Sequence, residues 1–109
     1  VLALSAPGGR KIITGTIMAI VNMVDFGMGV QAALDAPRVH CEGHDLDVML
    51  EDGIPAEVLD ELRALGHELD VTAMYQEPYG RMQSIGLDVD TGLYFGASEP
   101  RSHSGVRGY

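Results

Sequence analysis

A proline followed by two glycines separates the two most clearly patterned stretches at the start of this sequence. Residues 1–6, which precede Pro7-Gly8-Gly9, form an apolar run that is typical of a β-strand. Over residues 10–25, side chains suited to a buried face recur with helical spacing instead. The sequence therefore predicts a strand, a tight turn and a buried helix. The recurring positions of this helix are Ile12, Ile13, Thr16, Ile17, Ile20, Met23 and Val24.

Strand-like and helix-like segments continue to alternate along the rest of the chain. A short helix should end before Pro37, because the residue that precedes a proline is pushed out of the helical region. Pro55 suits the first position of another helix, and Gly66 suits the position just past its end. Such a mixture, with a hairpin turn at Asp90-Thr91-Gly92, argues for an α/β layer structure that contains antiparallel pairing. We expect helices over residues 30–35 and 55–65, the latter with Val58, Leu59, Leu62 and Leu65 on one face, and strands around residues 47–51, 68–72 (Leu69 and Val71 inward), 82–88 and 93–97.

Charge and hydropathy exclude several classes of partner. Sixteen acidic against seven basic side chains give a formal net charge of −9. A surface of this sign repels phosphates, so nucleic acid is not an expected partner. No apolar run approaches the roughly 20 residues that a membrane-spanning helix needs. The single cysteine, Cys41, excludes a disulfide within the chain but leaves the compartment open.

The length and the first residue bear on domain organisation. A chain of 109 residues fits one domain, and at this length about two-thirds of the surface of the unfolded chain is buried on folding. The sequence begins with Val1, which already belongs to an apolar run. We therefore expect residues 1–109 to be a single fragment of a longer protein.

Pro7-Gly8-Gly9 is also the most informative candidate site. Glycines let the backbone approach a ligand closely, and amide N–H groups at a helix N-terminus carry partial positive charge. Such a turn can hold a phosphate, a carboxylate or the oxyanion of a tetrahedral intermediate. The sequence fits neither the phosphate loop nor the G-x-G-x-x-G dinucleotide pattern. The purely local alternative is a tight turn that lets the helix pack on the strand.

Residues 40–47 contain several side chains that can bind metals. A zinc site here would use His40, Cys41 and His44 with Asp45 or Asp47. These spacings match no established zinc pattern, so we expect no metal and no other cofactor. A nucleophilic Cys41 would need a base and an orienting group. We expect a half-buried thiol without a catalytic role instead.

Three charged residues near turns are expected to have structural roles. Asp35 and Arg38 flank the corner after the second helix, where both side chains can bond to the backbone. Arg101 can pair with Glu99 or reach back to a buried carboxylate.

A series of short motifs runs along nearly the whole chain. The two most specific are Ala36-Pro37-Arg38 and Gly96-Ala97-Ser98-Glu99-Pro100-Arg101. The others are Pro7-Gly8-Gly9, Ile12-Ile13-Thr14, Asn22, Asp25-Phe26-Gly27-Met28, Val30-Gln31, Asp35, His40, residues 62–67, Gln83, Ile85, Asp88 and Gly108-Tyr109. In this order and spacing the motifs resemble the C-terminal part of the small subunit in the gamma-glutamyltransferase (gamma-glutamyltranspeptidase) family.

The resemblance implies an α+β chain that is part of an αββα four-layer sandwich of the N-terminal-nucleophile hydrolase class. In this family a precursor cleaves itself and frees an N-terminal Thr on the small subunit. That Thr forms a γ-glutamyl ester and passes the acyl group to water or to an amino acid, so the implied substrates are small, glutathione-like γ-glutamyl compounds. The implied partners are the large subunit and the upstream part of the small subunit. Only the family resemblance suggests a periplasmic or extracellular location.

The resemblance also assigns roles to residues of the turn. It places the oxyanion hole at the paired glycines Gly8 and Gly9. The nucleophile and the groups that bind the glutamate carboxylate and amine belong to the segment upstream of this chain, so the fragment alone is expected to be inactive. Thr14 and Thr16 do not replace the nucleophile, because both fall inside the predicted helix. Arg10 stands where many family members carry Ser, and we expect it to influence which acyl groups enter.

Two alternatives stay open on the sequence. The same fold occurs in related acylases that act on a cephalosporin side chain or on polyglutamate, and the upstream residues that grip the α-carboxylate and α-amine would distinguish them. A non-catalytic domain that kept the sheet and lost the site would lack a Thr at an upstream cleavage point.

Overall fold

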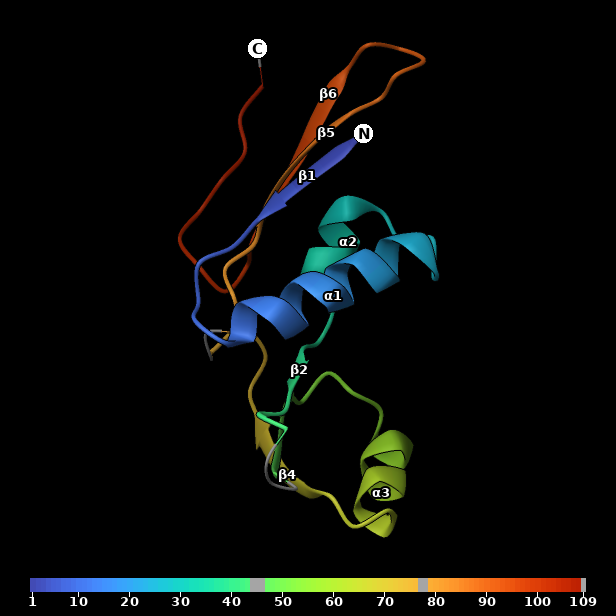
Figure 1. The fold of residues 1–109 in the computed structure, drawn as a ribbon, viewed down its shortest axis with the longest axis vertical. Coiled ribbons are helices and arrows are strands. Elements are labelled where there is room, and N and C mark those ends of the chain that lie inside the picture. Colours follow the sequence, from blue (N-terminus) through green and yellow to red (C-terminus); the bar gives the residue numbers. More distant parts are fainter. Residues whose placement is uncertain (44–46, 77–78, 109) are drawn as a thin grey trace.

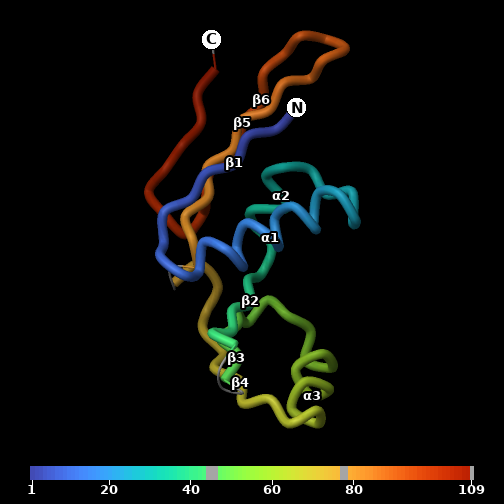
Figure 2. Tube along the Cα trace, in the orientation of Figure 1, coloured from blue at the N-terminus to red at the C-terminus, as the bar shows by residue number. Residues whose placement is uncertain are grey.

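The chain folds into two three-stranded sheets that follow one another along an elongated molecule (Figures 1 and 2). The computed structural model describes residues 1–43, 47–76 and 79–108, so Tyr109 lies outside the described residues. The molecule measures 48 × 25 × 22 Å. Two helices lie beside the first sheet, and a third lies beside the second (Figure 1). The expected α+β class is confirmed.

The first sheet has the strand order β1-β5-β6 and is antiparallel throughout. β1 (Leu2–Ser5) pairs with β5 (Gln83–Leu87), which forms a hairpin with β6 (Tyr94–Ser98). α1 (Lys11–Val24) packs on α2 (Val30–Asp35), and α2 packs on β6. The strand, the turn, both helices and the hairpin that the sequence predicts in this part of the chain are confirmed.

The second sheet has the order β2-β3-β4 and contains both kinds of pairing. β2 (Val39–His40) runs antiparallel to β3 (Asp47–Glu51), whereas β3 and β4 (Glu68–Thr72) are parallel. α3 (Ala56–Ala64) connects the two parallel strands, since such strands need a crossover between them. The sequence predicted β3, α3 and β4, but it did not predict β2 or the parallel pairing. β2 has two residues, too few to show an alternating pattern.

The prediction that the first helix is buried is wrong for most of its surface. In α1 only Gly15 and Ala19 are buried. One stripe of the helix faces a core cluster that consists of Ala19, Leu34, Met82 and Ala97. The opposite side is apolar but exposed, and it carries Ile13, Ile17, Ile20 and Val24. Within the described ranges, neither α1 nor any other helix is long and apolar enough to span a membrane.

The apolar face predicted for the helix after Pro55 is only partly covered. Leu59 and Leu62 of α3 are half-buried, but Val58 and Leu65 are exposed. α3 lies mainly against β4, which is an edge strand, and this position leaves part of the helix uncovered. In β4 itself Leu69 is half-buried, whereas Val71 is exposed, so its predicted inward position is wrong.

Candidate functional site

The candidate site begins at the turn between β1 and α1. Gly8 and Gly9 are exposed and have φ angles of 143° and 62°, which residues with a side chain rarely adopt. In the part of the chain that the structure describes, neither of their amide N–H groups donates a backbone hydrogen bond. α1 begins directly afterwards, where the Ile12 N–H donates to the Gly9 carbonyl oxygen at 3.2 Å and no side chain caps the helix. N–H donors beside the positive end of a helix dipole can bind an anion or an oxyanion.

Arg10, the residue after the glycines, contacts an acidic side chain from the segment that follows β2. Its Nη1 atom lies 3.2 Å from Oε2 of Glu42, and the Arg10 side chain is 79% exposed. Oε1 of Glu42 lies 3.3 Å from Nε2 of His40. Nδ1 of the same imidazole lies 2.9 Å from the hydroxyl oxygen of Thr14 on α1. These polar contacts connect the side chain of Arg10 to β2 and to α1, although Nε2 of His40 lies near Glu42 without a hydrogen bond in the described residues.

The residues considered for a metal or thiol site have other environments. His40 is buried, and both of its ring nitrogens take part in the contacts with Thr14 and Glu42. Cys41 is exposed rather than half-buried as predicted, because the chain leaves the sheet after β2. His44 and Asp45 lie outside the described residues. Among the residues that are described, no three His, Cys, Asp or Glu side chains are grouped so that they could hold a metal ion.

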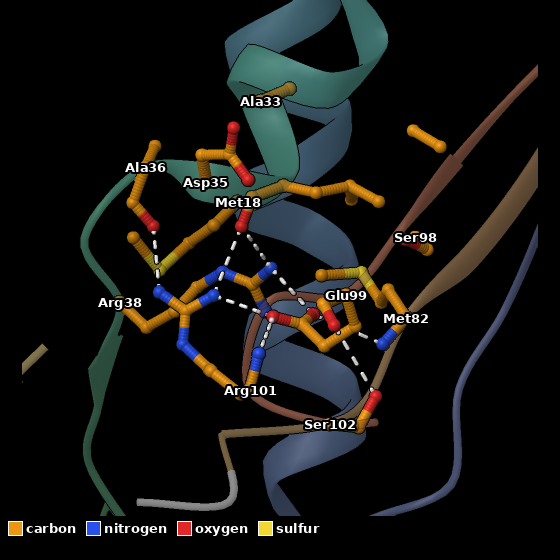
Figure 3. Close-up of polar contacts among 12 residues, drawn as sticks. Met18, Ala33, Asp35, Ala36, Arg38, Met82, Ser98, Glu99, Arg101 and Ser102 are labelled. Atoms are coloured by element: carbon orange, nitrogen blue, oxygen red, sulfur yellow. Dashed lines mark hydrogen bonds and ion pairs between the residues drawn. The ribbon is translucent and has the colours of Figure 1, made fainter. Parts of the chain in front are cut away.

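Two arginines and two glutamates, namely Arg38, Arg101, Glu51 and Glu99, form a buried ion cluster between the sheets. Figure 3 shows Arg38, Glu99 and Arg101 of this cluster. Glu51 ends β3 of the second sheet, and Arg38 lies directly before β2 of the same sheet. Glu99 and Arg101 follow β6 of the first sheet. Nη1 of Arg101 lies 2.7 Å from Oε1 of Glu99. Nε of Arg101 lies 2.8 Å from Oε1 of Glu51. Nη2 of Arg38 lies 3.1 Å from Oε2 of Glu99. The cluster therefore links the two sheets.

The same cluster binds backbone groups from several segments. The carbonyl oxygens of Leu34 and Ala36 accept hydrogen bonds from the arginines, and the N–H groups of Arg38, Tyr75 and Met82 donate to the glutamates. The sequence predicted that Arg101 pairs with Glu99 or with a buried carboxylate, and both kinds of pairing are present. Asp35 differs from the prediction, because its carboxylate accepts a hydrogen bond from the Gln31 side chain rather than from the backbone.

Hydrogen bonding offsets the cost of burying these charges unequally. Burial raises the pKa of Glu51, but a hydrogen bond from Arg101 and two from backbone N–H groups outweigh it, so this pKa lies below its usual value. Burial lowers the pKa of Arg101, but hydrogen bonds to Glu51 and Glu99 hold it above its usual value. Burial dominates for Arg38 and lowers its pKa. Within the described ranges, Nε and Nη1 of Arg38 have no hydrogen-bond acceptor.

Comparisons with known proteins agree on one family. The family model described as Gamma-glutamyltranspeptidase matches residues 1–109. A glutathione hydrolase proenzyme of Escherichia coli (strain K12) is 37% identical over 101 residues, which are 93% of this chain and 17% of that protein. A highly active mutant of gamma-glutamyltranspeptidase from Pseudomonas nitroreducens has a solved structure with a TM-score of 0.85 and 26% identity, over 99% of this chain and 55% of that chain.

A second activity occurs among the similar structures. The cephalosporin acylase of Bacillus halodurans has a TM-score of 0.82 and 31% identity, over 97% of this chain and 20% of that chain. The chain described here spans about one sixth of the length of the glutathione hydrolase proenzymes that it matches. These structures give it the α+β fold of part of an N-terminal-nucleophile hydrolase.

Proposed function

The chain belongs to the gamma-glutamyltranspeptidase family, and we propose that residues 1–109 are the C-terminal portion of the small subunit of a gamma-glutamyltransferase. The whole protein would transfer or hydrolyse the γ-glutamyl group of glutathione-like substrates. Two observations support the assignment: the family match extends over all the residues, and the glutathione hydrolase proenzymes are about six times longer than this chain. Residues 1–109 would then be one part of an αββα sandwich that other segments complete.

The single observation that carries the proposed chemistry is the pair of N–H groups of Gly8 and Gly9 at the start of α1. In the proposed reaction, Oγ of an N-terminal Thr outside this chain attacks the γ-carbonyl carbon, and its proton passes to the α-amino group of that Thr. The carbonyl oxygen becomes an oxyanion, which accepts hydrogen bonds from Gly8 and Gly9. The C–N bond then breaks, and the leaving amine takes the proton, so that a γ-glutamyl ester remains. Water or the amino group of an acceptor attacks this ester, and Oγ recovers a proton.

The proposal requires partner segments, namely a large subunit and the upstream part of the small subunit. The relatives are named proenzymes, a name that agrees with processing into subunits. The exposed apolar side of α1 supports the same conclusion, because large apolar patches usually contact another surface. We expect the isolated chain to have no activity, since it supplies an oxyanion turn without a nucleophile. Release of chromophore from a γ-glutamyl anilide by the purified chain would contradict this expectation.

Kinetics of a Gly9→Val variant of the full-length, processed enzyme tests the role of the turn. Valine is disfavoured at a φ of 62°, and its side chain would stand where backbone and substrate meet. We expect kcat to fall on the order of 100- to 1,000-fold, with a smaller change in KM. Gly27→Val is a matched control, because Gly27 has a φ of 65° and, like Gly9, open space around the position of a side chain. An unchanged kcat per active site in Gly9→Val would remove Gly9 from the catalytic residues.

An acylase that acts on a cephalosporin side chain is the second candidate. The likeness to the Bacillus halodurans cephalosporin acylase favours it, at 31% identity and a TM-score of 0.82. The two candidates share the oxyanion turn and differ in the acyl group that they accept. Comparing kcat/KM of the full-length protein for a γ-glutamyl anilide and for a cephalosporin side-chain amide decides between them.

A further inference from the structure

The segment that precedes β5 runs against the Pro7-Gly8-Gly9 turn. Arg81 donates its backbone N–H to the carbonyl oxygen of Pro7 at 3.0 Å. A side chain on Gly8 would place its first carbon 2.9 Å from Cα of Gly80, closer than real carbon atoms of this kind approach. The two backbones therefore touch with no side chain between them. Figure 1 shows the chain before β5 passing the N-terminal end of α1.

Gly80 is enclosed on its other side by the first turn of α1. A side chain on Gly80 would place its first carbon 3.2 Å from the Lys11 carbonyl oxygen and 3.5 Å from Cα of Ile12. Gly80 also has a φ of 89°, a conformation that favours glycine. Gly80 thus lies between Gly8 and the backbone of the helix whose N-terminus forms the candidate site.

The segment around Gly80 is itself held firmly. On its C-terminal side, the Met82 N–H donates to Oε2 of Glu99 at 3.1 Å, and Glu99 belongs to the buried ion cluster of Figure 3. On its N-terminal side, Tyr79 is buried, and its hydroxyl oxygen lies 3.3 Å from the hydroxyl oxygen of Thr72 on β4. A segment anchored in this way cannot yield easily if the turn or the helix presses on it. It can therefore serve as a fixed support for the glycine turn.

We propose that Gly80 is a positioning residue for the oxyanion hole. Because Gly80 has no side chain, an anchored backbone segment can support both Gly8 and the first turn of α1, and this contact sets the direction of the N–H groups of Gly8 and Gly9. The inference rests on the proposed role of those two glycines. Oxyanion donors act over a narrow range of about 2.7–3.1 Å, so a displacement of a few tenths of an ångström at the turn reduces their effect.

The test compares Gly80→Ala with Gly66→Ala in the full-length, processed enzyme. Gly66 has a φ of 96° and open space around the position of a side chain, so its alanine variant has similar backbone strain without a collision. In Gly80→Ala the methyl group presses on the Lys11 carbonyl. We expect kcat per active site to fall on the order of 10- to 100-fold in Gly80→Ala, with little change in KM. Gly66→Ala should keep the kcat of the unmodified enzyme.

Inhibitor binding separates positioning from a merely structural role. A boronate analogue of the γ-glutamyl group mimics the tetrahedral intermediate, whereas glutamate does not. Gly80→Ala should weaken boronate inhibition by about the factor lost in kcat, and it should leave glutamate inhibition unchanged. If only the yield of folded enzyme falls while kcat and boronate inhibition persist, the positioning role is wrong.

Two further variants complete the test. If Gly9→Val lowers kcat and Gly80→Ala does not, only the positioning role is overturned, whereas the proposed oxyanion role itself fails if neither variant changes kcat. If Gly80→Ala does not fold, the amide of Arg81 can be replaced by an ester, which removes only the N–H donated to Pro7. We expect this change to lower kcat by about 3- to 10-fold, the value of one hydrogen bond. An unchanged kcat in the ester variant would overturn the proposal.

Discussion

Glu51, the last residue of β3, accepts two hydrogen bonds from the guanidinium of Arg101, fifty positions later in the segment after β6. Paired N–H donors on one carboxylate are among the stronger and more directional polar contacts in proteins. In the described ranges no strand ladder joins the two sheets. This pair, together with Glu99 and Arg38, therefore provides a connection that the sheets themselves lack.

Removing Arg101 should destabilise the full-length protein strongly. Arg101→Met leaves Glu51 buried without its main partner, and breaking a buried pair in this way typically costs about 3–5 kcal/mol. Arg63→Met is the control, because Arg63 pairs with Asp60 on the surface of α3, where the two side chains are 51% and 77% exposed. That control should lose at most about 1 kcal/mol. Urea unfolding measures both, and equal midpoints for the two variants would contradict the prediction.

Glu51 should also make stability depend on pH in the acid range. Its pKa is lower in the folded state than in the unfolded chain. An unperturbed glutamate has a pKa of about 4.3. Its carboxylate therefore contributes stability that is present above the unfolded pKa and is lost as pH falls through the folded pKa. Glu51→Gln should be less stable at neutral pH, and its stability should decline less below about pH 4.3. Glu57→Gln, on the exposed surface of α3, should keep the full decline. Parallel pH curves for the unmodified protein and Glu51→Gln would refute the prediction.

The elements that depend on local pattern were predictable from the sequence. α1 and the β5–β6 hairpin follow from apolar spacing and from turn residues such as Asp90-Thr91-Gly92, and all of this information lies within each segment. The surfaces that pack against these elements could not be predicted from local pattern. Periodicity shows that Ile13 and Ile17 are apolar positions of a helix, but it does not show which surface covers them.

Contacts between distant segments explain what the sequence could not reveal about the site. The Pro7-Gly8-Gly9 turn was recognisable from composition alone. The residues that contact this turn and Arg10 could not be recognised from the sequence. Glu42 contacts Arg10, and Gly80 lies against Gly8, only in the folded chain. Glu51 carried a misleading signal, since an acidic residue in an alternating strand is normally interpreted as solvent-exposed.

The isolated chain should self-associate through the exposed apolar side of α1. Exposed apolar patches and free strand edges favour pairing with another surface. Replacing Ile17, which is 55% exposed on that side, with Lys should shift the isolated chain toward monomer. Val89→Lys is the control, because Val89 is 68% exposed but lies beyond β5, away from α1. Sedimentation velocity measures the association state. A monodisperse monomer of the unmodified chain at high concentration would count against the prediction.

Arg10 should influence the choice of acyl donor rather than the rate of turnover. Arg10 directly follows the glycine turn, and its guanidinium lies 3.2 Å from Glu42. The side chain is 79% exposed, so water and salt weaken its attraction for a substrate. An exposed ion pair contributes at most about 1 kcal/mol, which corresponds to about a 5-fold change in binding.

We therefore expect Arg10→Ser, in the full-length processed enzyme, to raise KM by up to about 5-fold for a γ-glutamyl donor whose leaving group carries a carboxylate. A donor with a neutral leaving group should be unaffected, and kcat should be unchanged for both. The difference should disappear near 1 M salt, where the Debye length is only about 3 Å. Arg63→Ser removes an equally charged side chain from α3 and should alter neither KM. If the ratio of the two KM values is the same in Arg10→Ser as in Arg63→Ser, Arg10 takes no part in donor selection.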